Sequence, residues 1–168
     1  MVVLLAIFDS LDTVSKSQAY QADRTQSIDD MRGALNRLTK ELRQATSVTE
    51  PTATPSPTLT YVTYINDVST TITYTATGTY DSSGVCTSPA SCNLTRKVGS
   101  NDAFTVLTHL ASSAVFTPAT ATTVDVTGIQ WVEIDLSVTP ARSPNTTLAL
   151  QAKVNLRNRT AALTGTAS

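Results

Sequence analysis

Hydrophobic residues in the first 46 positions recur at helical spacing. Reading backwards from Ala45, they step by 3, 4, 3, 4 and 3 residues, which places six apolar side chains on one stripe of a helix. No proline occurs between Val2 and Thr46, and Gly33 is the only glycine there. The pattern predicts one continuous helix of about 45 residues, roughly 65–70 Å long. The stripe consists of Ile28, Met31, Leu35, Leu38, Leu42 and Ala45.

This helix has three zones of different polarity. The first, MVVLLAIF, is apolar all round; residues 15–27 are mostly polar; the last zone is amphipathic, with Arg37 and Glu41 paired on its solvent side. A polar zone of that length has no core to pack on, so we expect a projecting helix whose last third holds a globular head. The alternative is a two-helix hairpin broken near residues 15–27.

The apolar start is short for a membrane role. A spanning helix needs about 20 apolar residues, and a secretory signal needs a basic start and a small-residue cleavage site. MVVLLAIF has only eight apolar residues before Asp9, and it has neither a basic start nor a small-residue cleavage site. The run is either a core segment or the downstream end of a longer apolar segment.

The rest of the chain favours strands. The helix is expected to stop by Glu50, where TSVTEPTATPSPT (46–58) predicts a stiff surface connector. Residues 58–66 and 69–77, with a break at Asn66–Asp67, predict a hairpin. NLTRKV (93–98) predicts a short strand, while residues 103–116 are ambiguous between helical and extended structure before a strand at 114–117.

Two longer segments, 128–138 and 147–158, alternate apolar and polar residues. Such alternation predicts an antiparallel sheet with one buried face, which the stripe of the helix matches. The fold class is therefore α+β, a long N-terminal helix packed on one face of an antiparallel sheet. We expect a projecting helix over 1–50, a sheet head over 51–160 and a flexible tail over 161–168.

Composition narrows the functional classes. The net charge is −1 and charged residues are 15%, so no basic excess points to nucleic acid. Cys86 and Cys92 flank a Ser- and Pro-containing loop, which favours a disulfide stapling that loop, with two free thiols as the alternative. Their spacing does not fit the CxxC redox motif.

Candidate catalytic groups are few. The only histidine, His109, sits among apolar neighbours, and Glu133 and Asp135 share one face of a strand that we expect to face solvent. DSSG (81–84) is interpreted as a turn rather than a calcium loop. We expect no catalytic residue, metal or cofactor, and a hydrolase would require His109 or the carboxylate pair in a pocket.

Nearly the whole chain resembles the type IV pilin-like proteins, specifically minor pilins and J-type minor pseudopilins of type II secretion. The helix carries most of the likeness, through FDSLDTVSKSQAYQADRTQSIDDMRGALNRLTKELRQA with its L-x-x-x-L-R-Q-A ending. The order of Y-x-A (74–76), N-L-T-R (93–96), V-L-T-H-L (106–110) and Phe116, and the closing KVNLRNRT, adds to it. The basic leader, the glycine cleavage point and the F-T-x-x-E start of that family have no counterpart, so we expect the chain to begin at an internal methionine, about a dozen residues into an apolar helix of about 20.

The resemblance implies a non-enzymatic subunit of the bacterial cell envelope. It would lie in the inner membrane as a precursor and then enter a periplasmic or extracellular fibre, with other pilin or pseudopilin subunits as partners and no small-molecule substrate. The apolar start would pack in the membrane and fibre, and the stripe would dock helix to sheet. The residues expected to pack in the fibre are Val2, Val3, Leu4, Leu5, Ile7 and Phe8.

One alternative belongs to another class. A secreted β-rich adhesin or binding module, with the helix as its stalk, fits the same pattern of elements. Incorporation into sheared filaments distinguishes the two, because a binding module would remain a soluble monomer.

Overall fold

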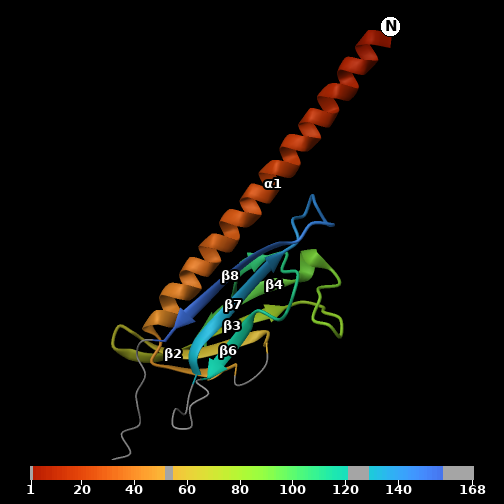
Figure 1. Cartoon of the computed structure of the whole chain (residues 1–168). Coiled ribbons are helices and arrows are strands. Elements are labelled where there is room, and N and C mark those ends of the chain that lie inside the picture. The colour runs from red at the N-terminus through yellow and green to blue at the C-terminus, as the bar shows by residue number, and fades with distance from the viewer. Residues whose placement is uncertain (1, 52–54, 121–128, 157–168) are drawn as a thin grey trace, which may run out of the picture.

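The computed structural model describes residues 2–51, 55–120 and 129–156. One helix, α1 (Val2–Gln44), precedes eight strands. Figure 1 shows α1 as a straight rod whose final third lies along the strands, while its N-terminal part continues away from them. The expected continuous helix is therefore present, and the hairpin alternative with a break near residues 15–27 is wrong.

The helix ends earlier than Glu50. The chain leaves α1 after Gln44, and the backbone N–H of Thr46 donates to the carbonyl of Val62 at 2.8 Å. Residues Ser47–Glu50 then form β1, which pairs antiparallel with β2 (Thr58–Ile65). The prediction of a connector was wrong here because the β-branched residues that stop the helix also suit an edge strand. The first sheet thus begins at Ser47, within the segment that was expected to be connector.

The first sheet has five antiparallel strands in the order β1-β2-β3-β4-β5. It contains the predicted hairpin, β2 with β3 (Val68–Thr77), and its turn residues Asn66 and Asp67 both have positive φ, 50° and 63°. Such a two-residue turn matches the twist of the strands it joins. The predicted short strand is β4 (Asn93–Val98), and the 3₁₀ turn Pro89–Ser91 precedes it.

The second sheet has three antiparallel strands in the order β6-β7-β8. The ambiguous segment proved extended, with β5 (Phe104–Thr108) closing the first sheet and β6 (Phe116–Thr120) opening the second. The two alternating segments are β7 (Ile129–Val138) and β8 (Leu148–Asn155), paired from Trp131↔Asn155 to Val138↔Leu148. The coarse α+β class is as predicted, but the head holds two sheets where one was expected.

The core lies between α1 and the inner faces of both sheets. The helix contacts β7 and β8 of the second sheet and β2 and β5 of the first. Isolated bridges, including Leu110↔Val138 and Ser56↔Phe116, tie the sheets together at their margins. The largest fully buried side chains come from all three parts: Met31, Leu38, Leu42, Leu59, Tyr61, Ile72, Tyr74, Leu94, Leu110, Phe116, Ile134 and Leu136.

Candidate functional site

The docking stripe of α1 is the first feature that bears on function. Met31 is 1% exposed, and Leu38 and Leu42 are completely buried. Ile28 and Leu35 are half-buried and pack against the same core. Because each fully buried apolar side chain of this size stabilises the fold by about 1.5–3 kcal/mol, the last third of the helix is an integral part of the head.

A carboxylate beside this stripe binds four partners. Glu41 Oε2 accepts hydrogen bonds from the hydroxyls of Tyr61 and Tyr74, at 2.5 and 2.8 Å, and from Arg96 Nε at 3.1 Å. Its other oxygen, Oε1, lies 3.0 Å from Arg96 Nη2 and 3.3 Å from Arg37 Nε. The expected Arg37–Glu41 pair is present, but its placement on the solvent side was wrong for Glu41, which points into the head.

The partners of Glu41 come from three elements of the first sheet and the helix itself. Tyr61 on β2, Tyr74 on β3 and Arg96 on β4 all lie on the face of the sheet turned towards α1, and all three are buried. The two tyrosine rings stack with centroids 6.5 Å apart. One carboxylate therefore fixes the helix against three strands at once.

The electrostatics of this cluster favour an ionised Glu41. Burial raises the pKa of the carboxyl group, but hydrogen bonds from Tyr61, Arg96 and Tyr74 outweigh it, so its pKa lies below the usual value. Burial, together with the neighbouring carboxylate, raises the pKa of both tyrosines above their usual range. The cluster thus holds a carboxylate whose charge is balanced by Arg96, and it connects the helix to the sheet. It is not a proton donor near neutral pH.

Sequence reasoning missed this cluster, although a signal exists. NLTRKV alternates so that Arg96 shares a face with the buried Leu94, and Tyr61 shares a face with the buried Leu59. A charged residue on the apolar face of a strand requires a partner of opposite charge. Glu41, next to Leu42 on the stripe, was the available carboxylate.

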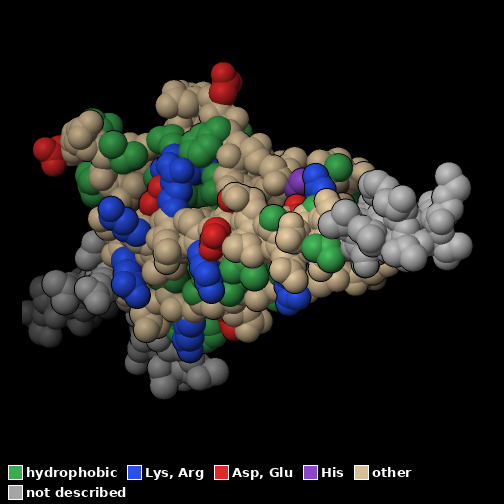
Figure 2. Space-filling model, turned by 90° about the horizontal axis from the view of Figure 1, so that it is seen from above, with side chains coloured by type: hydrophobic (Ala, Val, Ile, Leu, Met, Phe, Trp, Pro, Cys, Tyr) green, Lys and Arg blue, Asp and Glu red, His purple; other side chains and the backbone are tan. Residues whose placement is uncertain are grey.

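Several large apolar side chains remain exposed at one end of the first sheet. Tyr64 and Val68, at the tip of the β2–β3 hairpin, are 62% and 64% exposed. Phe104 on β5 is partly exposed, with the guanidinium groups of Arg37 and Arg96 5.1 and 5.6 Å from its ring centre. On the face shown in Figure 2, Lys, Arg, Asp and Glu side chains are separated by uncharged surface.

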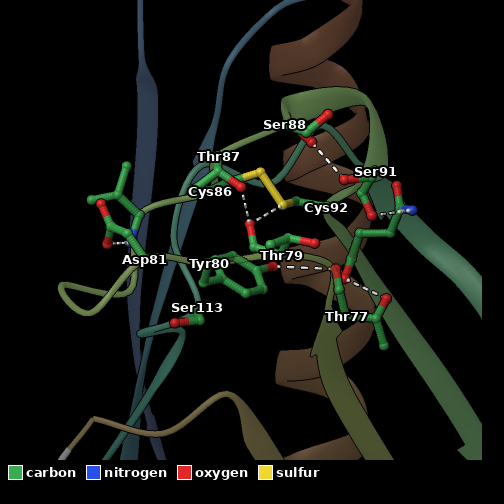
Figure 3. The surroundings of a disulfide bond; sticks show 12 residues. Thr77, Thr79, Tyr80, Asp81, Cys86, Thr87, Ser88, Ser91, Cys92 and Ser113 are labelled. Atoms are coloured by element: carbon green, nitrogen blue, oxygen red, sulfur yellow. Dashed lines mark hydrogen bonds between the residues drawn. A yellow bond between two sulfur atoms is a disulfide. The ribbon is translucent and has the colours of Figure 1, made fainter.

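The two cysteines form the predicted disulfide. Cys86 and Cys92 have their Cα atoms 6.3 Å apart, and Figure 3 shows the bond bridging the loop to the start of β4. The loop is further closed by Thr87, whose backbone N–H and hydroxyl both donate to the Thr79 carbonyl at 3.0 Å. Gly78 has φ +136°, and a Cβ there would lie 2.7 Å from the Cys92 Cα, so the turn requires glycine.

The DSSG segment is a turn, as interpreted from the sequence. Asp81 Oδ1 accepts hydrogen bonds from the backbone N–H groups of Ser83 and Val85, at 2.8 and 2.9 Å. This arrangement is an Asx-type turn that uses the carboxylate to shape the loop. Within residues 2–51, 55–120 and 129–156, no group of three His, Cys, Asp or Glu side chains is placed to hold a metal ion.

Among the residues that the structure describes, the candidate catalytic groups share no side-chain hydrogen bond or ion pair with one another, although the carbonyl of His109 accepts a hydrogen bond from the backbone N–H of Thr139, just beyond β7, at 3.0 Å. His109 has φ 59°, and its Nδ1 lies 3.1 Å from the hydroxyl of Thr108. Glu133 and Asp135 lie on β7, opposite Lys153 and Gln151 of β8. Both carboxylate residues are half-buried rather than fully on the solvent face, and Asp135 Oδ1 is a buried acceptor with no hydrogen-bond partner in the described part of the chain.

The predicted fibre-packing residues fall at the start of α1. Val2, Val3, Leu4, Leu5, Ile7 and Phe8 are all helical. Their side chains lie outside the described residues, so their packing remains a prediction. In the part of the chain that the structure describes, no helix is both long and apolar enough to cross a membrane.

Comparison with known proteins gives no further assignment. No family model, curated protein or solved structure matches the chain. Any function must therefore be argued from the geometry described above and from the sequence pattern.

Proposed function

We propose that the chain is a non-enzymatic minor pilin or pseudopilin subunit, which assembles through its N-terminal helix into a pilus or a type II secretion pseudopilus. The observation that carries the proposal is that the two ends of α1 have different surroundings. Residues from Ile28 to Leu42 are packed into the head, while the helix continues for more than twenty residues towards an apolar start. A rod of this kind offers its far end to other helices or to lipid.

The mechanics follow from the chemistry of that far end. Apolar residues in the first eight positions gain about 25 cal/mol per Å² when they leave water, so a bundle of like helices or a bilayer stabilises them. The head is then carried on the outside of the bundle. The Glu41 cluster supports this role, because a helix tied to three strands transmits the position of the helix to the whole head.

The alternative of a secreted adhesin or binding module has one observation in its favour. The hairpin tip exposes Tyr64 and Val68, and exposed apolar side chains of this size are typical of contact surfaces. In a fibre subunit, the same tip would contact a neighbouring head. In a binding module it would contact a soluble or surface ligand.

Fibre incorporation separates these candidates. Filaments are sheared from cells that express the protein from its native locus, and the pelleted filaments are probed with an antibody against the head. The proposal expects the chain in the pellet together with the major subunit. A chain recovered only as a soluble monomer, which binds a ligand without any filament, would favour the binding module instead.

A further inference from the structure

A cleft of about 180 Å³ lies where the middle of α1 meets the loop between β7 and β8. Three of its lining residues, Lys16, Ala19 and Tyr20, come from the helix, and the fourth, Arg142, comes from the loop. Two of the four are permanently basic and one carries a hydroxyl group. Such a lining suits an anion with several oxygen acceptors.

The loop is held in place beside the helix. The backbone N–H of Arg142 donates to Asp23 Oδ2 at 2.8 Å, across 119 residues of sequence. Lys16, Tyr20 and Asp23 follow one another at steps of 4 and 3, so they share one helical stripe. Because the Asp23 carboxylate is engaged by the loop backbone, it anchors the wall of the cleft that carries Arg142.

The cleft lies at a defined height along the helix. Lys16 follows Phe8 by eight residues, which places its Cα about 12 Å further along the axis at 1.5 Å per residue. Side chains of a helix lean towards its N-terminus, and a lysine stem can extend further along an apolar surface. Figure 1 shows that the β7–β8 loop is the part of the head that reaches furthest towards the start of α1.

These heights match a membrane boundary. The polar layer of a bilayer is about 5–8 Å thick on each side of the hydrocarbon core. If the apolar start lies in that core, the ammonium group of Lys16 reaches the headgroup layer and Arg142 faces it from the head. Tyr20, which is 48% exposed, lies four residues beyond Lys16, about 6 Å further from the apolar start and on the water side of that layer.

We propose that this cleft binds the phosphate of an anionic lipid headgroup, with Lys16 and Arg142 as the donors, and so seats the head on the membrane before assembly. The inference rests on the proposed function, since it requires the start of α1 to enter a bilayer. It adds a lipid partner and fixes which side of the head faces the membrane. The contact is electrostatic and reversible, so a subunit can leave the membrane for a fibre.

Vesicle binding tests this directly. The chain is co-sedimented with vesicles of phosphatidylcholine alone and with vesicles containing phosphatidylglycerol, for the wild type and for the double variant K16Q/R142Q. We expect tighter binding to the anionic vesicles, and a loss of about fivefold for each basic residue removed, near 25-fold for the pair. Binding to neutral vesicles is expected to stay unchanged.

A matched control separates this cleft from general charge. K40Q/R43Q removes the same charge from exposed positions at the other end of α1, and we expect it to bind anionic vesicles within about twofold of the wild type. The inference is overturned if both double variants lose affinity equally, if K16Q/R142Q binds like the wild type, or if the wild type does not prefer anionic vesicles. Inorganic phosphate that, at constant ionic strength, abolishes the preference for anionic vesicles completely would also overturn it, since that would indicate a site for the free anion rather than for a headgroup held in a bilayer.

The result is independent of the fibre experiment. A chain that is absent from filaments but binds anionic vesicles through Lys16 and Arg142 would contradict the proposed function alone. If the chain is found in filaments but its vesicle binding does not depend on these two residues, the lipid site alone would be contradicted.

Discussion

Arg96 on β4 binds both carboxylate oxygens of Glu41 on α1, with Nη2 3.0 Å from Oε1 and Nε 3.1 Å from Oε2. The Arg96 side chain is 9% exposed and that of Glu41 is 18% exposed. A two-point contact of this kind fixes direction as well as distance. Together with the buried stripe, it holds this part of α1 against the first sheet.

Removing the charge of Glu41 should destabilise the head. Glu41→Gln leaves Arg96 as a buried cation without a counter-charge, and we expect the free energy of unfolding in urea to fall by about 3 kcal/mol. Arg37→Gln is the matched control, because Arg37 binds the same carboxylate from a side chain that is 46% exposed. That substitution should lower the free energy of unfolding by less than about 1 kcal/mol. Equal decreases for the two variants would contradict a buried Glu41–Arg96 pair.

The same carboxylate predicts how stability depends on acid. Because the pKa of Glu41 is lowered in the folded state, the unfolded chain takes up the proton first, and its contribution is fully present only above the ordinary pKa of about 4.3. It is lost as the pH falls through the lowered folded pKa. Urea unfolding between pH 7 and pH 3 should show the wild type and Glu41→Gln converging at the acid end, and a gap that stays constant would refute the assignment.

The docking stripe can be tested at its centre. Leu38→Asp places an unpaired charge at a position with 0% exposure, and we expect a loss of about 4 kcal/mol or more in unfolding free energy. Asn36→Asp adds the same charge to an exposed position two residues away and should change stability by less than about 0.5 kcal/mol. An unchanged melting temperature for Leu38→Asp would show that the helix does not dock through this stripe.

The disulfide should contribute modestly and locally. It closes a loop between residues six positions apart, for which the loss of chain entropy in the unfolded state corresponds to about 2 kcal/mol. Thermal unfolding with and without reductant should reveal that difference in the wild type. The variant C86S/C92S should be insensitive to reductant, and a wild type equally insensitive would mean that the bond does not stabilise the head.

The helix was predictable because its signal is local. The 3–4 spacing from Ile28 to Leu42 specifies one buried face, and the absence of proline specifies continuity. The β2–β3 hairpin was predictable for the same reason, since Asn66–Asp67 sits between two alternating runs. The buried faces of β7 and β8 likewise follow from alternation alone.

Pairing between distant segments was not predictable in this way. Alternation indicates which face of a strand is buried but not which strand lies beside it, so the division into two sheets could not be read from the sequence. Glu41 illustrates the consequence. Its distance of four residues from Arg37 suggested a surface pair, and only the registers of β2, β3 and β4 bring Tyr61, Tyr74 and Arg96 to it.

The contribution of the first eight residues needs a substitution that spares the head. Leu5→Asp places a charge inside the apolar run, far along α1 from the docking stripe, while Gln18→Asp adds the same charge to an exposed position outside the run. Neither change touches the buried core of the head, so both variants should unfold at the wild-type temperature.

The measurement that tests the account most directly is the amount of each variant in filaments sheared from cells. Assembly through the N-terminal helix predicts the wild type and Gln18→Asp in the filament pellet, and Leu5→Asp in the supernatant as a folded subunit. Leu5→Asp recovered in the pellet at the wild-type level, or a wild type found only as a soluble monomer, would contradict it.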